Sequence, residues 1–262
     1  MYVRPARVGA VEPDGPAANR WVIHFEGGGG CQTFESCAER WCGVGFYTAH
    51  QMSTTYENDA ILRGGLLERN STNKLADRNT VMVNYCSSDS WQGQKSDVVF
   101  RSETDSTKPY TAHYRGATIA ALLAGVAGMP KLSDATDVLI SGDSAGATAV
   151  RTHLDRIAAR LRGNLESTFM PNVNGRQGFP AGDPRDPVSV TKTASSEKEF
   201  ALMNNQLDDS CLAAHPGARY VCADNGCVEL NHITTPVFQI QDLVDRGFPL
   251  RRHKSARRCT TS

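Results

Sequence analysis

A serine between two glycines has the clearest chemical potential in this 262-residue chain. The motif at residues 142–146, Gly-Asp-Ser-Ala-Gly, directly follows the apolar run 138–140. This order predicts a strand, a sharp turn and a helix. Glycines suit the flanks of such a turn because larger side chains would collide with the strand or the helix. The pattern predicts that Ser144 is a nucleophile for acyl transfer. A flexible Gly/Ser turn could have the same sequence, so the assignment of a nucleophile needs a second, independent motif.

That second element is a run of four glycines, residues 27–30, which follows the apolar run Trp21–Phe25 and Glu26. A glycine loop can expose its amides, and acyl transfer needs at least two N–H donors aimed at the oxyanion. One donor usually comes from the residue after the nucleophile and another from such a loop. A phosphate-binding loop is the alternative, but neither a Gly-Lys-Ser/Thr ending nor a Gly-x-Gly-x-x-Gly pattern is present. The predicted oxyanion donors are Gly28, Gly29 and Ala145.

Together these residues resemble the pectin acetylesterase and Notum family of carboxylesterases. The first matching motif is residues 24–31 together with Cys37, six residues further on. Further matching motifs follow in the same order as in the family, at 83–86, 114–117, 140–146 and 236–238. It implies an α/β-hydrolase fold, in which a mostly parallel sheet has helices on both faces. It also implies hydrolysis of carboxylic esters by a Ser, Asp, His triad in that chain order, without a metal or organic cofactor. The position of Gly30 is more often aromatic in the family, which bears on the shape of the acyl pocket.

The resemblance places the triad acid just after the apolar run 236–240. Asp242 and Asp245 are both available there, and the spacing favours Asp245. Its role would be to hold the histidine in the useful tautomer and to stabilise the imidazolium. Asp143 is beside the serine, but adjacent positions on such a turn diverge, so we expect it to be a poor orienting partner.

The general base is the difficult assignment. Seventeen residues follow Asp245, and His253 is the single histidine among them. The eight-residue gap leaves no room for the helix and strand that carry this histidine in the family, so a solvated tail residue is the alternative. His232 lies closest before the run 236–240, but a base there would break the family order.

The C-terminal tail differs in composition from the rest of the sequence. Residues 246–262 contain six basic side chains, no acidic side chain and no apolar periodicity. A nucleic-acid-binding arm, a family variant and a truncated or misread ending are the three explanations. The 28 basic residues of the whole chain balance 28 acidic ones, which argues against a nucleic-acid-binding arm. We therefore favour truncation, in which the C-terminal strand and helix of the fold are missing. We expect one domain over 1–245 and an aberrant tail over 246–262.

Eight cysteines are many for a cytosolic enzyme of this size. No paired His/Cys clusters with zinc-ligand spacing are predicted, so disulfides with undetermined connectivity are expected. They indicate an oxidising compartment, secreted or periplasmic, although residues 1–10 have no signal-peptide core. No run approaches the length of a membrane span.

Apolar periodicity predicts further strands at 80–85 and 137–141, and helices from about 113 to 127 and from the serine turn to about 162. In the second helix Val150, Leu154, Ile157 and Leu161 form the expected buried stripe. Alternating strands and helices indicate a parallel sheet. Residues 163–206 are polar with little periodicity, so a cap over the site and a disordered insertion are both open.

Two functions remain. The first is a monomeric serine carboxylesterase that removes O-acetyl groups from a pectin-like polysaccharide through an acyl-enzyme on Ser144. The second is a hydrolase-fold binding protein for carbohydrate, whose triad is incomplete. Neither a nucleic-acid partner nor a membrane span is expected.

Overall fold

The computed structural model describes residues 19–42, 52, 65–68, 71–102, 109–123, 132, 135–161, 164–169 and 196–239. The predictions for the two chain ends, including Asp242, Asp245 and His253, lie outside the described residues. The division into a domain over 1–245 and a tail over 246–262 therefore stays a prediction.

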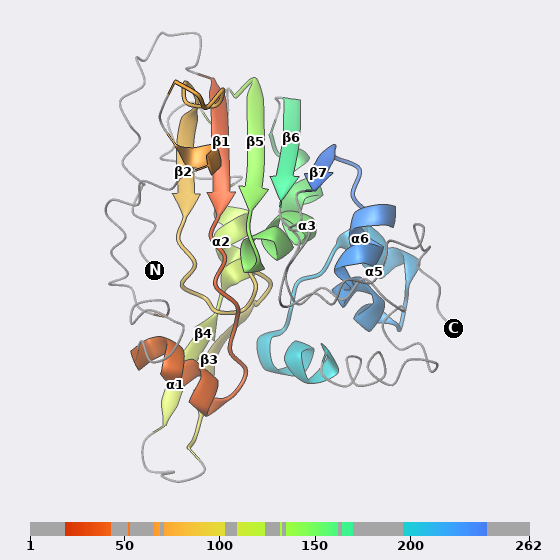
Figure 1. Cartoon of the computed structure of the whole chain (residues 1–262). Coiled ribbons are helices and arrows are strands. Elements are labelled where there is room, and N and C mark those ends of the chain that lie inside the picture. The colour runs from red at the N-terminus through yellow and green to blue at the C-terminus, as the bar shows by residue number, and fades with distance from the viewer. Residues whose placement is uncertain are drawn as a thin grey trace, which may run out of the picture.

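A five-stranded parallel sheet organises the described part of the chain (Figure 1). Its strand order is β2-β1-β5-β6-β7, and each neighbouring pair is parallel. The strands are β1 (Arg20–Phe25), β2 (Asn79–Val83), β5 (Asp137–Gly142), β6 (Asn164–Phe169) and β7 (Val237–Gln239). This arrangement confirms the predicted α/β-hydrolase type of sheet.

The middle of the sheet is the core of the molecule. In β1, Trp21, Val22 and Ile23 are almost fully buried, as the near-continuous apolar runs of parallel strands predict. Helix α3 (Ala145–Ala158) contacts β1, β5 and β6 and covers this part of the sheet. Its side chains Val150, Leu154 and Ile157 are buried, so the predicted apolar stripe is confirmed. The prediction ran the helix on to about residue 162, whereas α3 ends at Ala158.

Two sequence predictions were wrong. The helix expected from residue 113 begins at Gly116 as α2 (Gly116–Leu123), because β4 (Tyr110–Tyr114) precedes it and pairs antiparallel with β3 (Lys95–Phe100). The sequence predicts a cap or a disordered insertion over residues 163–206, but Asn164–Phe169 form β6, which pairs with both β5 and β7 inside the sheet. Residues 170–195 lie outside the described residues, so the prediction is untested there. Residues 196–203 of the same segment are helical.

Shorter elements surround the sheet. Helix α1 (Phe34–Cys42) and the β3–β4 hairpin lie beyond the carboxyl ends of the strands, at the bottom of Figure 1. Helices α5 (Asp209–Ala214) and α6 (Asn225–Asn231), with the 3₁₀ turn η3 (Arg219–Ala223), form a second apolar cluster. A further 3₁₀ turn, η1, spans Gly65–Leu67. No helix in the described ranges has the length and apolar character needed to cross a membrane.

Disulfide bonds join Cys31 to Cys37 and Cys211 to Cys222, which confirms that cysteines staple loops. They fit an oxidising compartment. Cys86 is a free, half-buried thiol, and burial raises its pKa.

Candidate active site

The two predicted site elements follow neighbouring strands. The glycine loop follows β1 and the serine turn follows β5, and the register pairs Phe25 with Gly142 at the ends of those strands. Since both strands run in the same direction, their following loops meet at one edge of the sheet. Ligands of open α/β sheets bind at this carboxyl edge.

Ser144 has the backbone conformation of a nucleophile elbow. Its φ of 51° and ψ of −114° place a non-glycine residue at positive φ, a conformation that costs free energy and is concentrated at functional sites. A Cβ at Gly142 would collide with the Gly146 carbonyl, and one at Gly146 with the Phe25 carbonyl. Ser144 is partly exposed, and α3 begins directly after it, so the positive end of the helix dipole lies at the turn.

In the glycine loop, two backbone carbonyls accept hydrogen bonds from side chains, while the N–H groups predicted to bind the oxyanion are available. Gly28 and Gly29 have φ values of 134° and 69°, which other residues rarely adopt. Arg40 Nη1 donates to the Gly28 carbonyl at 2.5 Å, and the Tyr85 hydroxyl donates to the Gly29 carbonyl at 2.7 Å. Within the described part of the chain, no hydrogen bond uses the N–H of Gly28, Gly29 or Ala145. These are the donors an oxyanion hole requires.

Asp143 links the serine turn to the glycine loop. Its Oδ1 accepts from His24 Nε2 at 3.1 Å and from the Gly27 N–H at 3.3 Å. The other ring nitrogen of His24 lies 2.8 Å from Ser141 Oγ, its register partner on β5. The sequence predicts that Asp143 is a poor orienting partner, and its contact with His24 is a feature that the sequence did not reveal. His24 and Ser141 occupy equivalent positions near the ends of two predicted strands, and this is the sequence feature from which their contact could have been predicted.

Other described histidines have structural partners. His153 is fully buried in α3, where Nε2 donates to the Trp91 carbonyl at 2.7 Å, and burial lowers its pKa to about 4. His232 Nδ1 lies 3.1 Å from Ser210 Oγ, and its ring packs edge-on against His215. Among the histidines that the structure describes, none is hydrogen-bonded to Ser144. The structure therefore brings the serine and its predicted oxyanion donors together, while Asp245 and His253 lie outside the described residues.

A buried carboxylate that the sequence pattern did not reveal fixes the turn after β2. Asp89 accepts hydrogen bonds from Ser87 Oγ at 2.6 Å, from the Trp91 N–H at 3.0 Å and from the Gly116 N–H at 2.7 Å. Its burial raises its pKa to about 6. Glu26 acts similarly, because its Oε2 accepts from the Tyr85 N–H at 2.9 Å. Together they hold Tyr85 and Trp91 against the glycine loop.

One group of side chains has the composition of a metal site. Cys211, His215, Cys227 and His232 each place one ligand atom within 4.8 Å of the others. Their Cys-x₃-His and Cys-x₄-His spacing is present in the sequence, contrary to the prediction that no Cys/His pairs have zinc-ligand spacing. Cys211 is joined to Cys222, and Cys227 is also disulfide-bonded, so neither sulfur is a thiolate that could bind a metal.

The comparisons with known proteins agree with this geometry. The sequence profile of the Pectinacetylesterase family matches residues 11–248. The palmitoleoyl-protein carboxylesterase NOTUM of Drosophila melanogaster is 26% identical over 88% of this chain and 34% of its own length. Pectin acetylesterase 4 of Arabidopsis thaliana is 29% identical over 88% of this chain and 53% of its own length. This chain thus spans from a third to about half of these two relatives.

A solved structure of the Wnt deacylase Notum from Drosophila superposes with a TM-score of 0.67. It is 23% identical, and the match covers 87% of this chain and 64% of that one. At this identity the likeness supports the fold. The family match covers most of the sequence and includes both the serine turn and the glycine loop, and we conclude that the chain belongs to the pectinacetylesterase family.

Proposed function

We propose that this chain is a serine carboxylic-ester hydrolase with Ser144 as its nucleophile. The observation that carries the proposal is the partly exposed Ser144, held at positive φ opposite a glycine loop with available N–H groups. Relatives named as carboxylesterases and acetylesterases support the same reaction class.

In the proposed reaction Ser144 Oγ attacks the acyl carbon of the ester. The negative charge that forms on the carbonyl oxygen is stabilised by the N–H groups of Gly28, Gly29 and Ala145 and by the N-terminus of α3. The serine proton passes to a histidine and then to the leaving alcohol. Water next attacks the acyl-enzyme and releases the acid. His253 as this base and Asp245 as its orienting acid remain proposals.

The proposed substrate is an O-acetyl ester on a pectin-like polysaccharide, acted on by a secreted or periplasmic monomer. The names of the plant relatives support an acetyl group, whereas the NOTUM name indicates a long acyl chain for that protein. Gly30 supplies no side chain to the wall of an acyl pocket. Rates on 4-nitrophenyl acetate, butyrate and palmitate separate the two classes, and we expect the acetate to be the best substrate.

The test of the reaction itself combines turnover with covalent labelling. We expect the Ser144→Ala variant to lose about a thousandfold or more in kcat on 4-nitrophenyl acetate. A fluorophosphonate probe should label the unmodified chain and leave this variant unlabelled. Ser71→Ala removes an exposed hydroxyl and is the matched control. Equal rates and equal labelling in all three proteins would refute the proposal.

A second candidate is a carbohydrate-binding protein with an incomplete triad. The observation in its favour is that no described histidine is hydrogen-bonded to Ser144. This candidate predicts binding of acetylated pectin, measured by calorimetry, without fluorophosphonate labelling of the unmodified chain.

A further inference from the structure

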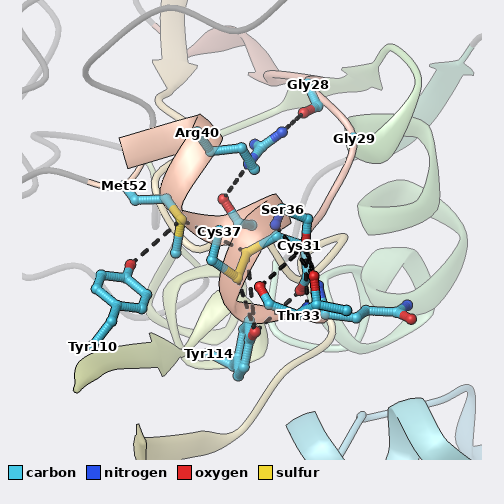
Figure 2. The surroundings of a disulfide bond; sticks show 12 residues. Gly28, Gly29, Cys31, Thr33, Ser36, Cys37, Arg40, Met52, Tyr110 and Tyr114 are labelled. Atoms are coloured by element: carbon cyan, nitrogen blue, oxygen red, sulfur yellow. Dashed lines mark hydrogen bonds between the residues drawn. A yellow bond between two sulfur atoms is a disulfide. The ribbon is translucent and has the colours of Figure 1, made fainter. Parts of the chain in front are cut away.

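Arg40 is a buried arginine in contact with the glycine loop. It lies on α1, has no exposed surface, and donates from Nη1 to the Gly28 carbonyl and from Nε to Ser88 Oγ at 2.8 Å. Figure 2 shows its side chain reaching from α1 to Gly28. A buried guanidinium is costly unless its N–H groups are bound. Its location beside a loop of four glycines therefore calls for a functional explanation.

The geometry of the peptide bond connects this contact to the predicted oxyanion hole. The Gly28 carbonyl and the Gly29 N–H belong to the same peptide unit, and no described peptide is cis. In a trans peptide the C=O and N–H point in opposite directions. Because Arg40 draws the carbonyl toward α1, the Gly29 N–H points away from α1. Without this hydrogen bond, glycine on both sides of the peptide would leave its plane free to rotate.

The next peptide is held in the same manner. The Tyr85 hydroxyl donates to the Gly29 carbonyl and accepts from the Ser90 N–H at 2.6 Å. Burial raises the pKa of Tyr85 well above its usual value, so the hydroxyl stays protonated and remains a donor. The guanidinium of Arg40 lies 5.9 Å from the centre of the Tyr85 ring, so the two side chains pack together behind the loop.

We propose that Arg40 is the positioning residue of the oxyanion hole, with Tyr85 as its partner, and that together they fix the two peptide planes on either side of Gly29. This inference rests on the proposed esterase function. The hydrogen bond from a charged guanidinium also polarises the Gly28–Gly29 peptide and makes its N–H a stronger donor. The effect should therefore increase as negative charge develops on the substrate oxygen, which is a transition-state effect.

Helix α1 is itself fixed to the loop, so Arg40 has a rigid base. The Cys31–Cys37 disulfide joins the residue after the glycines to the first turns of α1 (Figure 2). The Tyr114 hydroxyl donates to the Cys31 carbonyl at 3.0 Å. Thr33 and Ser36 exchange side-chain and backbone hydrogen bonds at the start of the helix.

The experiment compares ground-state and transition-state binding in three variants of the full chain. Arg40→Lys keeps the charge but loses the planar fork, and we expect kcat on 4-nitrophenyl acetate to fall about 10- to 100-fold with KM within about threefold. Tyr85→Phe removes one hydroxyl, and we expect a loss in kcat of about tenfold. Affinity for a trifluoromethyl ketone, which forms a tetrahedral adduct with an oxyanion, should fall in parallel with kcat/KM.

Arg78→Lys is the matched control, because Arg78 is also buried but pairs with Asp137 at the opposite edge of the sheet. It should change the melting temperature without changing kcat/KM or the ketone affinity. Tyr85→Phe keeps the test decisive if the Arg40 variant does not fold. Folded Arg40 and Tyr85 variants with unchanged ketone affinity would overturn the positioning role while Ser144 remains labelled. An unlabelled unmodified chain would instead reject the esterase function, and this inference with it.

Discussion

The two ends of β1 and β5 differ in how their polar groups are satisfied. At the amino ends Arg78 and Arg20 both bind Asp137, at 2.8 and 3.5 Å, and Arg20 also binds Asp77 at 3.0 Å. At the carboxyl ends the chain has glycines, Ser144 at positive φ and N–H groups without a partner in the described residues. The amino ends of these strands are thus stabilised by ion pairs, whereas the loops at their carboxyl ends are strained and have N–H donors available for a ligand.

The distribution of strained residues sharpens this contrast. Six described non-glycine residues have positive φ, and Ser88, Ser90, Trp91 and Ser144 are in the loops at the carboxyl edge. Strain persists where surrounding structure over-determines it. Here the buried side chains of Arg40, Tyr85 and Asp89 supply that structure.

The largest effect on stability and labelling is expected from adding a side chain where the serine turn packs against the end of β1. Gly146→Ala places a Cβ against the Phe25 carbonyl, so β1 and the serine turn must move apart. We expect a loss of about 3 kcal/mol or more in unfolding free energy, and loss of fluorophosphonate labelling. Chemical denaturation and labelling measure the two effects.

Gly217→Ala is the control for this substitution. Gly217 has a φ of +81° with no atom near the position of a Cβ, so only backbone strain of about 1 kcal/mol is expected. If both alanines cost the same, close packing at the serine turn is not the reason for Gly146.

A smaller effect is expected from the charge of Asp89. Its folded pKa of about 6 is above the unfolded value, so the native state binds more protons between pH 4 and 6. The contribution of Asp89 to stability should therefore be fully present below about pH 4 and be lost as the pH rises to about 6, by on the order of 3 kcal/mol. Denaturation at a series of pH values measures this slope.

Asp89→Asn should flatten that pH dependence. The variant should also be less stable by about 1–3 kcal/mol, because an amide N–H₂ would face the Gly116 N–H. A slope that survives the substitution would assign the titration to another group.

The smallest effect on the reaction is expected at the amino edge. Asp137→Asn weakens the contacts of Arg78 and Arg20 and should cost about 1–2 kcal/mol in unfolding free energy. We expect kcat/KM on 4-nitrophenyl acetate to stay within about twofold, since the strand ends are functionally separate. A tenfold loss of activity at unchanged melting temperature would contradict this separation.

The parts that sequence could predict are those with strong local patterns. The strands Arg20–Phe25 and Asp137–Gly142 contain apolar runs. The first is followed by Glu26 and the glycine loop, the second ends in Gly142, and the serine turn has a steric signature. The segment Asn164–Phe169 was missed because Asn-Leu-Glu-Ser-Thr-Phe has few apolar residues, and its membership of the sheet depends on the strands on either side. His113 fits a helical period as well as strand β4, so the helix was extended too far.

The support of the candidate site could not be predicted for a different reason. Arg40 looks like an ordinary surface residue of a short helix, and its burial depends on Ser88, which is 48 positions away. Asp89 likewise depends on the Gly116 N–H. Contacts of this kind arise from the packing of loops after separate strands, and local periodicity contains no information about them.

The short ring closed by Cys31 and Cys37 has a consequence for how the chain tolerates change. It confines the conformational freedom of the loop to the glycines themselves, so sequence drift at the exposed positions of α1, which do not include Arg40, can proceed without disturbing the carboxyl edge of the sheet. Reduction of this bond would be expected to loosen the loop before it melts the sheet, and inactivation by thiols would then precede unfolding.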